Sequence, residues 1–194
     1  MAMATSRSLG GLIVSLVAAL ALASCGGEGH SPSHHSALAW LRPTAVPTGW
    51  SVARLPSGTA TLAYPPNWRS IASDPGTVTA AQVGAGGLIV GYLNATPRQA
   101  NESLSNWSTF RPNHNAHEGD RHVRVLAAAL AVPFRSGRAS CVIDTYRTSR
   151  AHYHEIACLV DGARGSTVVV AAATGAAWHR QHEQLERAIQ AFQT

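Results

Sequence analysis

The sequence predicts an α+β domain in which an antiparallel sheet is flanked by helices. Short segments alternate apolar and polar residues between Gly/Pro-rich turns, which is typical of strands in antiparallel sheets. Two other segments repeat apolar residues every three or four positions, as a helix with one buried face does. Because strands come first, then a helix, then more strands and a closing helix, a layered α+β sandwich is expected.

Four strands are expected before the first helix, over residues 50–55, 59–64, 77–83 and 88–93. Pro56-Ser57-Gly58 and Asp74-Pro75-Gly76 are turn signals that separate them. Pro65 ends the second strand because proline lacks the N–H that a strand ladder needs. Residues 84–87, Gly-Ala-Gly-Gly, suit a hairpin loop between the third and fourth strands.

The spacing of apolar residues predicts a first helix over residues 97–110, with one face formed by Ala100, Leu104, Trp107 and Phe110. Thr96 and Pro97 provide a cap and a first-turn proline. We expect the helix to end before Pro112, with a polar loop over residues 112–121.

Four further strands are expected over residues 122–132, 139–147, 152–160 and 166–173. A final helix follows over residues 176–192, and its apolar face consists of Trp178, Leu185, Ile189 and Phe192.

The hairpin over residues 139–160 has a register that can be predicted. If Ser149 and Arg150 form the turn, four pairs lie opposite each other: Cys141 and Cys158, Ile143 and Ile156, Asp144 and Glu155, Tyr146 and Tyr153. Directly opposed Cα atoms are about 4.5 to 5.5 Å apart, which a disulfide accepts. The chain has three cysteines, and Cys25 belongs to the export signal described next, so Cys141 and Cys158 remain. A remaining pair in an exported chain also favours one disulfide, although two buried thiols are the alternative.

The N-terminus has the layout of an export signal. Arg7 precedes an apolar run that ends in Leu22-Ala23-Ser24-Cys25. This ending resembles the lipobox of bacterial lipoproteins, which implies a signal peptide over residues 1–24 and a diacylglycerol on Cys25. An ordinary signal peptide or a membrane anchor is the alternative, but the apolar run is shorter than the roughly 20 residues that span a bilayer.

Residues 25–48 are interpreted as the lipidated cysteine and a flexible tether, and residues 49–194 as one domain. Within the tether, Leu38-Ala39-Trp40-Leu41 is apolar. This piece either docks on the domain or lies at the membrane surface.

Two local patterns resemble the PsbP/Mog1-like fold. Tyr64-Pro65-Pro66-Asn67-Trp68 is similar to its "strand, Tyr-Pro, x-x-Trp" opening, and residues 185–192 are similar to its closing helix. With the lipobox, the chain resembles actinobacterial lipoproteins of the LpqN/LpqT type over residues 50–192. The resemblance implies an antiparallel sheet flanked by helices and an adaptor or accessory role, and it transfers no catalytic residue.

Charge gives no sign of a nucleic-acid partner. The fifteen basic residues are all arginines, of which only Arg7 lies in the signal, so the mature chain has 14 arginines against 10 acidic residues. These arginines are scattered, whereas a nucleic-acid footprint is clustered.

Asp144, Glu155, Tyr146 and Tyr153 form a candidate ligand patch on one face of the hairpin. Like charges directly opposed destabilise a sheet, so a cationic partner is expected, with Arg124 or Arg147 as candidates. The patch is interpreted as solvent-facing; ligand binding and carboxylate catalysis are the alternatives.

The histidines do not make a recognisable metal motif. His114-x-x-His117 with His122, and His179 with His182, have spacings that a metal could use, but no His-Glu-x-x-His or zinc-type cysteine pair is present. We expect no metal and no cofactor.

The sequence thus predicts a lipid-anchored, extracytoplasmic, non-enzymatic adaptor that binds a protein or cell-envelope component. The alternative is a carrier of a small ligand or lipid in a groove between helix and sheet.

Overall fold

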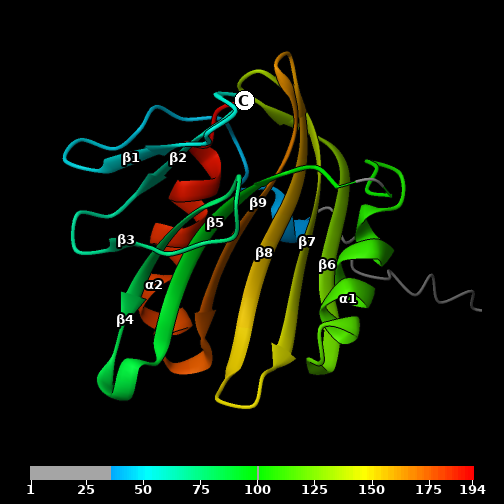
Figure 1. The fold of residues 1–194 in the computed structure, drawn as a ribbon. Helices are drawn as coiled ribbons and strands as arrows, with labels where there is room; N and C mark the ends of the chain where they lie inside the picture. The colour runs from blue at the N-terminus through cyan, green and yellow to red at the C-terminus, as the bar shows by residue number, and fades with distance from the viewer. Residues whose placement is uncertain (1–35, 100) are drawn as a thin grey trace, which may run out of the picture. The chain divides into compact units, whose positions relative to one another are not determined.

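The computed structural model describes residues 36–99 and 101–194, so the signal peptide and Cys25 lie outside the described residues. A seven-stranded antiparallel sheet dominates, with the strand order β3-β4-β5-β9-β8-β7-β6 (Figure 1). Its strands are β3 (Arg69–Ile71), β4 (Val78–Val83), β5 (Ile89–Pro97), β6 (Arg121–Phe134), β7 (Gly137–Arg147), β8 (His152–Gly162) and β9 (Gly165–Thr174). The other elements are β1 (Ser51–Arg54), β2 (Thr61–Tyr64), α1 (Trp107–His117), α2 (Gly175–Gln190) and the short 3-10 turns η1 (Ser36–Leu38) and η2 (Ala85–Gly87).

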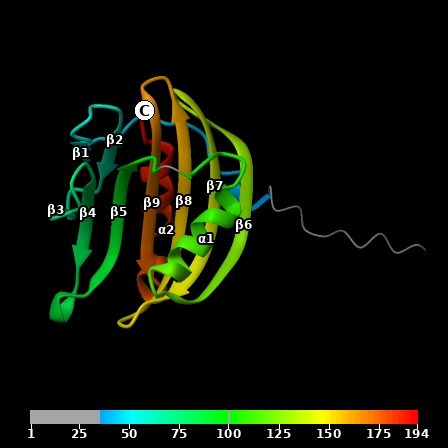
Figure 2. The same cartoon turned by 45° about the vertical axis from the view of Figure 1, so that its right-hand side comes forward.

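The two helices cover opposite faces of the large sheet (Figure 2). On the α2 face, the core includes Cys141, Cys158 and Val169; on the α1 face, it includes Val142 and Val170. Alternate residues of the central strands are therefore buried on both sides. The predicted α+β class, an antiparallel sheet flanked by helices, is confirmed.

Helix α2 packs on the sheet through the face that the sequence predicts. Leu185 and Ile189 are at most 1% exposed, whereas Trp178 is half-buried at the edge of this core. The helix ends at Gln190, before the predicted end at residue 192, so Phe192 is buried just beyond it. Close by, Thr61 in β2 and Gln193 exchange two backbone hydrogen bonds, which tie the small β1-β2 sheet to the C-terminus.

The apolar piece ahead of the domain docks on it. Leu38 and Leu41 are buried in the α2-side core, and Trp40 packs against that core. The packed part of the chain therefore begins at Leu38 and not near residue 49, because these side chains bury more apolar surface here than a solvated tether would.

The first helix differs from its predicted position. Residue 97 ends β5, and α1 begins ten residues later at Trp107 and continues through Pro112 to His117. A proline inside a helix costs about 3 kcal/mol. Tertiary contacts offset this cost: Trp107 is buried and donates from Nε1 to the carbonyl of Ala157 at 2.9 Å.

The β7-β8 hairpin has the predicted register at all four pairs, including Cys141 with Cys158 and Asp144 with Glu155. The two cysteines form a disulfide with Cα atoms 4.1 Å apart. The sequence did not predict β3, a three-residue edge strand without clear alternation.

Within residues 36–99 and 101–194, no helix combines the length and the apolar character that crossing a membrane requires.

Candidate binding site

The predicted carboxylate patch is buried, not solvent-facing. Asp144 and Glu155 are both 0% exposed, and Tyr146 and Tyr153 are 4% and 6% exposed. The interpretation as a solvent-facing patch is wrong because α1 packs against this face of the sheet, mainly over β6 and β7 (Figure 2). The strand register alone does not reveal that cover.

Arg111 on α1 is the cationic partner of Glu155. Its Nε donates to Glu155 Oε1 at 2.6 Å and its Nη2 donates to Oε2 at 2.9 Å, a two-point pair. Such pairs are among the stronger hydrogen-bonded contacts in proteins. A partner was expected, but Arg124 and Arg147, the residues proposed for that role, are exposed. No local pattern in the sequence connects position 111 to position 155.

Two tyrosine hydroxyls complete the network around Glu155. The hydroxyl of Tyr92 donates to Glu155 Oε2 at 3.2 Å. The two hydroxyls also lie 2.8 Å apart, and since the hydrogen of Tyr92 is used, Tyr146 donates to Tyr92. Burial and the nearby carboxylate raise the pKa of Tyr92, and burial raises that of Tyr146. Both tyrosines are therefore neutral donors at neutral pH.

Asp144 has no cation of its own. Asn115 donates to its Oδ2 at 3.5 Å, and its Oδ1 has no hydrogen-bond partner within the described part of the chain. Burial, and next the charge of Glu155, raise the pKa of Asp144 to about 8. One arginine thus balances one of two buried carboxyl groups, and the raised pKa of the other favours its protonated form.

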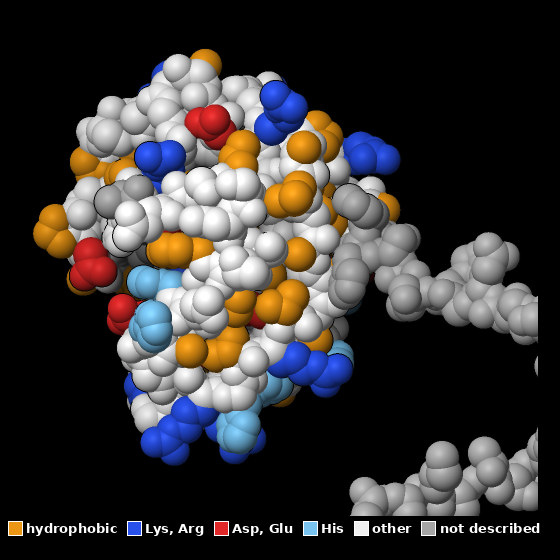
Figure 3. Space-filling view, turned by 90° about the vertical axis from the view of Figure 1, so that its right-hand side faces the viewer, with side chains coloured by type: hydrophobic (Ala, Val, Ile, Leu, Met, Phe, Trp, Pro, Cys, Tyr) orange, Lys and Arg blue, Asp and Glu red, His pale blue; other side chains and the backbone are white. Residues whose placement is uncertain are grey.

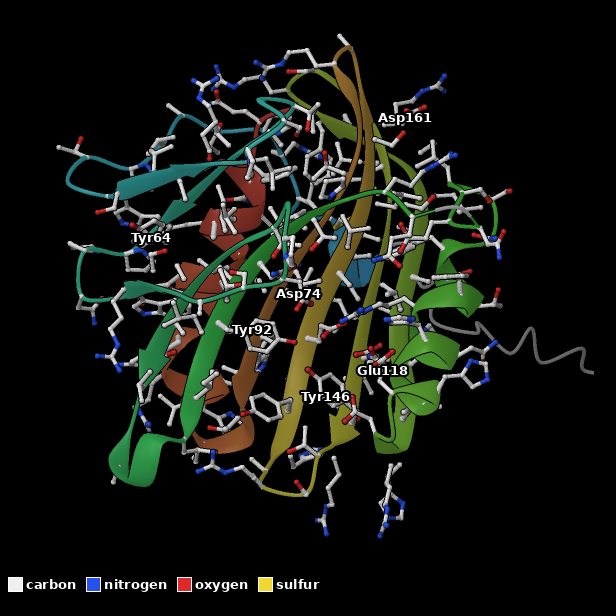
Figure 4. All side chains as sticks on the ribbon, viewed as in Figure 1. Tyr64, Asp74, Tyr92, Glu118, Tyr146 and Asp161 are labelled. Atoms are coloured by element: carbon white, nitrogen blue, oxygen red, sulfur yellow. A yellow bond between two sulfur atoms is a disulfide. The ribbon has the colours of Figure 1, made fainter. Side chains whose placement is uncertain are left out.

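A cleft of about 860 Å³ opens beside this network, over β4, β5 and β9. Arg111 and His114 of α1 form one side, and residues 72–75 with Thr77 form the other. Figure 4 labels Asp74 of the second side and Tyr92 of the floor. The floor consists of side chains from neighbouring strands: Thr79, Tyr92, Asn94, Thr96, Val168 and Val170. Asp144 and Glu155 do not line it.

Hydrogen bonds order the polar side chains of the cleft. Thr96 donates to Asn94 Oδ1 at 2.8 Å, and Asn94 Nδ2 donates to Thr79 Oγ1 at 2.8 Å. Ser73 also donates to Thr79 Oγ1, at 2.9 Å. Since Thr79 already accepts twice, its own O–H can donate to a bound molecule, while Thr96 Oγ1 can still accept.

The charged side chains that line the cleft are of both signs, Arg98 and Arg111 against Asp74 and Glu102. Arg111 is balanced by Glu155, and Glu102 accepts a hydrogen bond from the Gln99 backbone at 2.7 Å. Asp74 and Arg98, of opposite sign, are exposed. The arrangement therefore suits an uncharged molecule that both donates and accepts hydrogen bonds.

The described histidines that the sequence offered as metal ligands do not gather at one place. His114 and His117 are on α1, whereas His154 stacks on Trp178 with ring centroids 5.2 Å apart, and the ring centroid of His182 lies 6.4 Å from that of Trp178. Burial lowers the pKa of His154. Among residues 36–99 and 101–194, no three His, Cys, Asp or Glu side chains come together as metal ligands would.

Comparison with known proteins shows the fold. No protein-family model matches the chain, and no curated protein matches its sequence. The solution structure of cyanobacterial PsbP from Synechocystis sp. PCC 6803 matches with a TM-score of 0.53 at 14% identity, over 75% of this chain and 92% of that one. The fold is PsbP-like.

Two other solved structures match this PsbP-like chain more loosely. LpqN, involved in cell envelope biogenesis of Mycobacterium tuberculosis, matches with a TM-score of 0.44 at 12% identity, over 78% of this chain and 88% of that one. A protein from Bacteroides thetaiotaomicron matches with a TM-score of 0.43 at 10% identity, over 74% of this chain. This chain spans 47% of that protein. Membership of the LpqN/LpqT type stays a prediction.

Proposed function

We propose that this protein is a non-enzymatic binding protein of the bacterial cell envelope, held on the extracytoplasmic face of the membrane by a lipid on Cys25. The lipobox-like ending at Cys25 supports the anchor. The Cys141–Cys158 disulfide supports an extracytoplasmic location, because such bonds persist in oxidising compartments.

One observation carries the binding role: the hydrogen-bonded polar floor of the cleft. Thr79 and Thr96, fixed on either side of Asn94, offer a donor and an acceptor to an entering molecule. A volume of about 860 Å³ falls in the range of about 300 to 1,000 Å³ that small-molecule sites have. The ligand proposed is an uncharged, hydrogen-bonding molecule or the polar part of an envelope component.

The same floor argues against a carrier of wholly apolar lipid. A hydrocarbon chain over Thr79 and Thr96 would remove the free O–H of Thr79 and the free lone pairs of Thr96 from water without giving them new partners. Each such loss costs about 1 to 3 kcal/mol. The carrier alternative therefore survives only for a molecule with a polar head that covers these residues.

An enzyme is disfavoured by the position of the carboxyl groups. Asp144 and Glu155 lie close together and the pKa of Asp144 is raised, a combination that marks many active sites. However, both are fully buried, neither lines the cleft, and both oxygens of Glu155 are engaged by Arg111. Their arrangement is better explained as the attachment of α1 to the sheet.

The test of the cleft uses ¹⁵N-labelled mature protein and fractions of a bacterial envelope extract. We expect the Asn94 side-chain amide to shift with the aqueous fraction and not with the extracted apolar lipids. Thr79→Val, which keeps the shape but removes the hydroxyl, should weaken this response, whereas Thr48→Val at an exposed position should not. A response to apolar lipid alone would favour the carrier.

The test of the anchor is separate. Cys25→Ala should block processing of the precursor and should keep the mature protein from forming. Normal processing of this variant, with the product in the aqueous phase of a detergent partition, would show an ordinary signal peptide instead.

A further inference from the structure

Exposed apolar side chains gather on β6, one edge of the large sheet. Among the described residues, four large hydrophobic side chains are exposed, and three of them lie on this strand. These are Val125, Leu126 and Leu130, whose exposed fractions are 40%, 42% and 55%. The fourth, Val52, is on β1 in the small sheet. Figure 3 views the molecule from the side that carries the β6 edge. Single exposed apolar residues are ordinary, but three on one strand point to a contact surface.

The geometry of β6 opposes pairing with another strand. Its register against β7 shifts at three places, between Arg121 and Arg124, between Val125 and Ala127, and between Ala129 and Val132. At the last of these, Ala131 has a φ of 56°. Bulges of this kind twist an edge and stop it from extending the sheet. The partner of this edge therefore contacts side chains and does not add a strand.

The charges of β6 favour an anionic partner. Arg121, His122 and Arg124 are exposed, and the strand contains no acidic residue. Arginines near an anionic membrane surface are attracted to it. Aliphatic side chains next to arginines are typical of segments that lie at the boundary between lipid headgroups and acyl chains.

The chain reaches the folded part at this same edge. Turn η1 packs against β6, and Leu38 at its end is buried. Cys25 precedes Leu38 by 13 residues. A fully extended chain of that length spans about 45 Å, and a flexible one has an average end-to-end distance of about 20 Å. A lipid on Cys25 would therefore allow the β6 edge to reach the bilayer.

We propose that the β6 edge, through Val125, Leu126 and Leu130 with Arg121 and Arg124, lies on the anionic surface of the membrane. This inference rests on the proposed lipid anchor, and it adds an orientation: the domain lies edge-on. The cleft, which opens over β4, β5 and β9, then stays free for its ligand.

The test uses the mature lipidated protein in vesicles of phosphatidylethanolamine with phosphatidylglycerol. Single variants Leu126→Cys and Leu130→Cys carry a polarity-sensitive fluorophore; the native cysteines do not compete, since Cys141 and Cys158 are bonded to each other and Cys25 carries the lipid. Val52→Cys, 53% exposed in the small sheet, is the matched control.

We expect labels at positions 126 and 130 to shift to shorter emission wavelength and to be quenched by nitroxide-labelled lipids, and the label at 52 to do neither. Replacing Arg121 and Arg124 by Gln, or using phosphatidylcholine alone, should reduce the shift.

Equal emission at all three positions on vesicles would overturn the proposal. So would a shift that follows protein concentration and not lipid, because that would identify a contact between copies. Flotation of the unlabelled protein with vesicles tests the anchor independently, so a failed anchor and a wrong orientation give different results.

Discussion

Arg111 and Glu155 join α1 to the sheet through two hydrogen bonds, at 2.6 and 2.9 Å, between residues 44 positions apart in the sequence. The Glu155 side chain is fully buried and that of Arg111 is 15% exposed. Arg111 also lines the cleft, and α1 forms one side of it. The pair therefore holds that side of the cleft in position.

Breaking this pair should be costly. Glu155→Gln would leave the Arg111 charge buried without a counter-ion, which typically destabilises by about 3 to 5 kcal/mol. Glu183→Gln is the matched control, because Glu183 and Arg187 form a pair at 3.7 Å that is largely exposed. Exposed pairs contribute about 0 to 1 kcal/mol. The urea midpoints of the two variants measure these losses of stability. Equal shifts of the two midpoints would contradict the structural role of the Arg111–Glu155 pair.

Asp144 should make the stability depend on pH. In the folded protein its pKa is raised to about 8 from a normal value of 3.8. Between these values the folded state binds the extra proton, so this residue lowers the free energy of unfolding as pH rises, and its effect levels off above about pH 8. The limiting slope for one proton is about 1.4 kcal/mol per pH unit.

Asp144→Asn removes this group, so the variant should gain stability relative to the wild type as pH rises toward about 8. Urea unfolding between about pH 4 and pH 8 measures the difference in the free energy of unfolding between the variant and the wild type. Asp74→Asn, at an exposed position, controls for the change in net charge. A difference between variant and wild type that does not change with pH would show that Asp144 is already ionised in the folded protein.

Helix α2 should be a structural cover and not an appendage. Leu185 and Ile189 are at most 1% exposed, so truncation of either to Ala should cost about 2 to 5 kcal/mol. Gln184→Ala, on the exposed side of the same helix, should change stability by less than about 0.5 kcal/mol. Urea midpoints that move by the same small amount in all three variants would contradict this packing.

The disulfide should stabilise the β7-β8 hairpin. Cys141 and Cys158 are 17 positions apart, and closing a loop of this size contributes about 3 kcal/mol in the chain-entropy model. Intact mass should rise by two hydrogen atoms on reduction, and the urea midpoint should fall. Two thiols that react with maleimide in the unreduced, unfolded protein would contradict the bond.

Sequence patterns were sufficient for the central hairpin. Side chains alternate with a period of two and a short turn leaves one consistent register, so the pairs Cys141–Cys158 and Asp144–Glu155 could be predicted without knowledge of the rest of the fold. The closing helix was equally clear, because Leu185, Ile189 and Phe192 recur at helical spacing and all three are buried.

The cover over the carboxyl groups could not be predicted in this way. Both faces of β7, β8 and β9 are apolar, so the pattern does not say which helix lies on which face or how far it extends. Local rules also end a helix before Pro112, whereas contacts of Trp107 and Arg111 with β8 support α1 through that position.

The sequence by itself determined the α+β class, the hairpin register, the disulfide and the identity of the opposed carboxyl groups, since all of these depend on neighbours along one or two strands. Tertiary structure decided that Asp144 and Glu155 are buried, that Arg111 is the counter-ion and that a polar cleft opens over β5. The physical reason is distance along the chain: burial and pairing in that network depend on contacts between residues 44 to 63 positions apart, which no local spacing encodes.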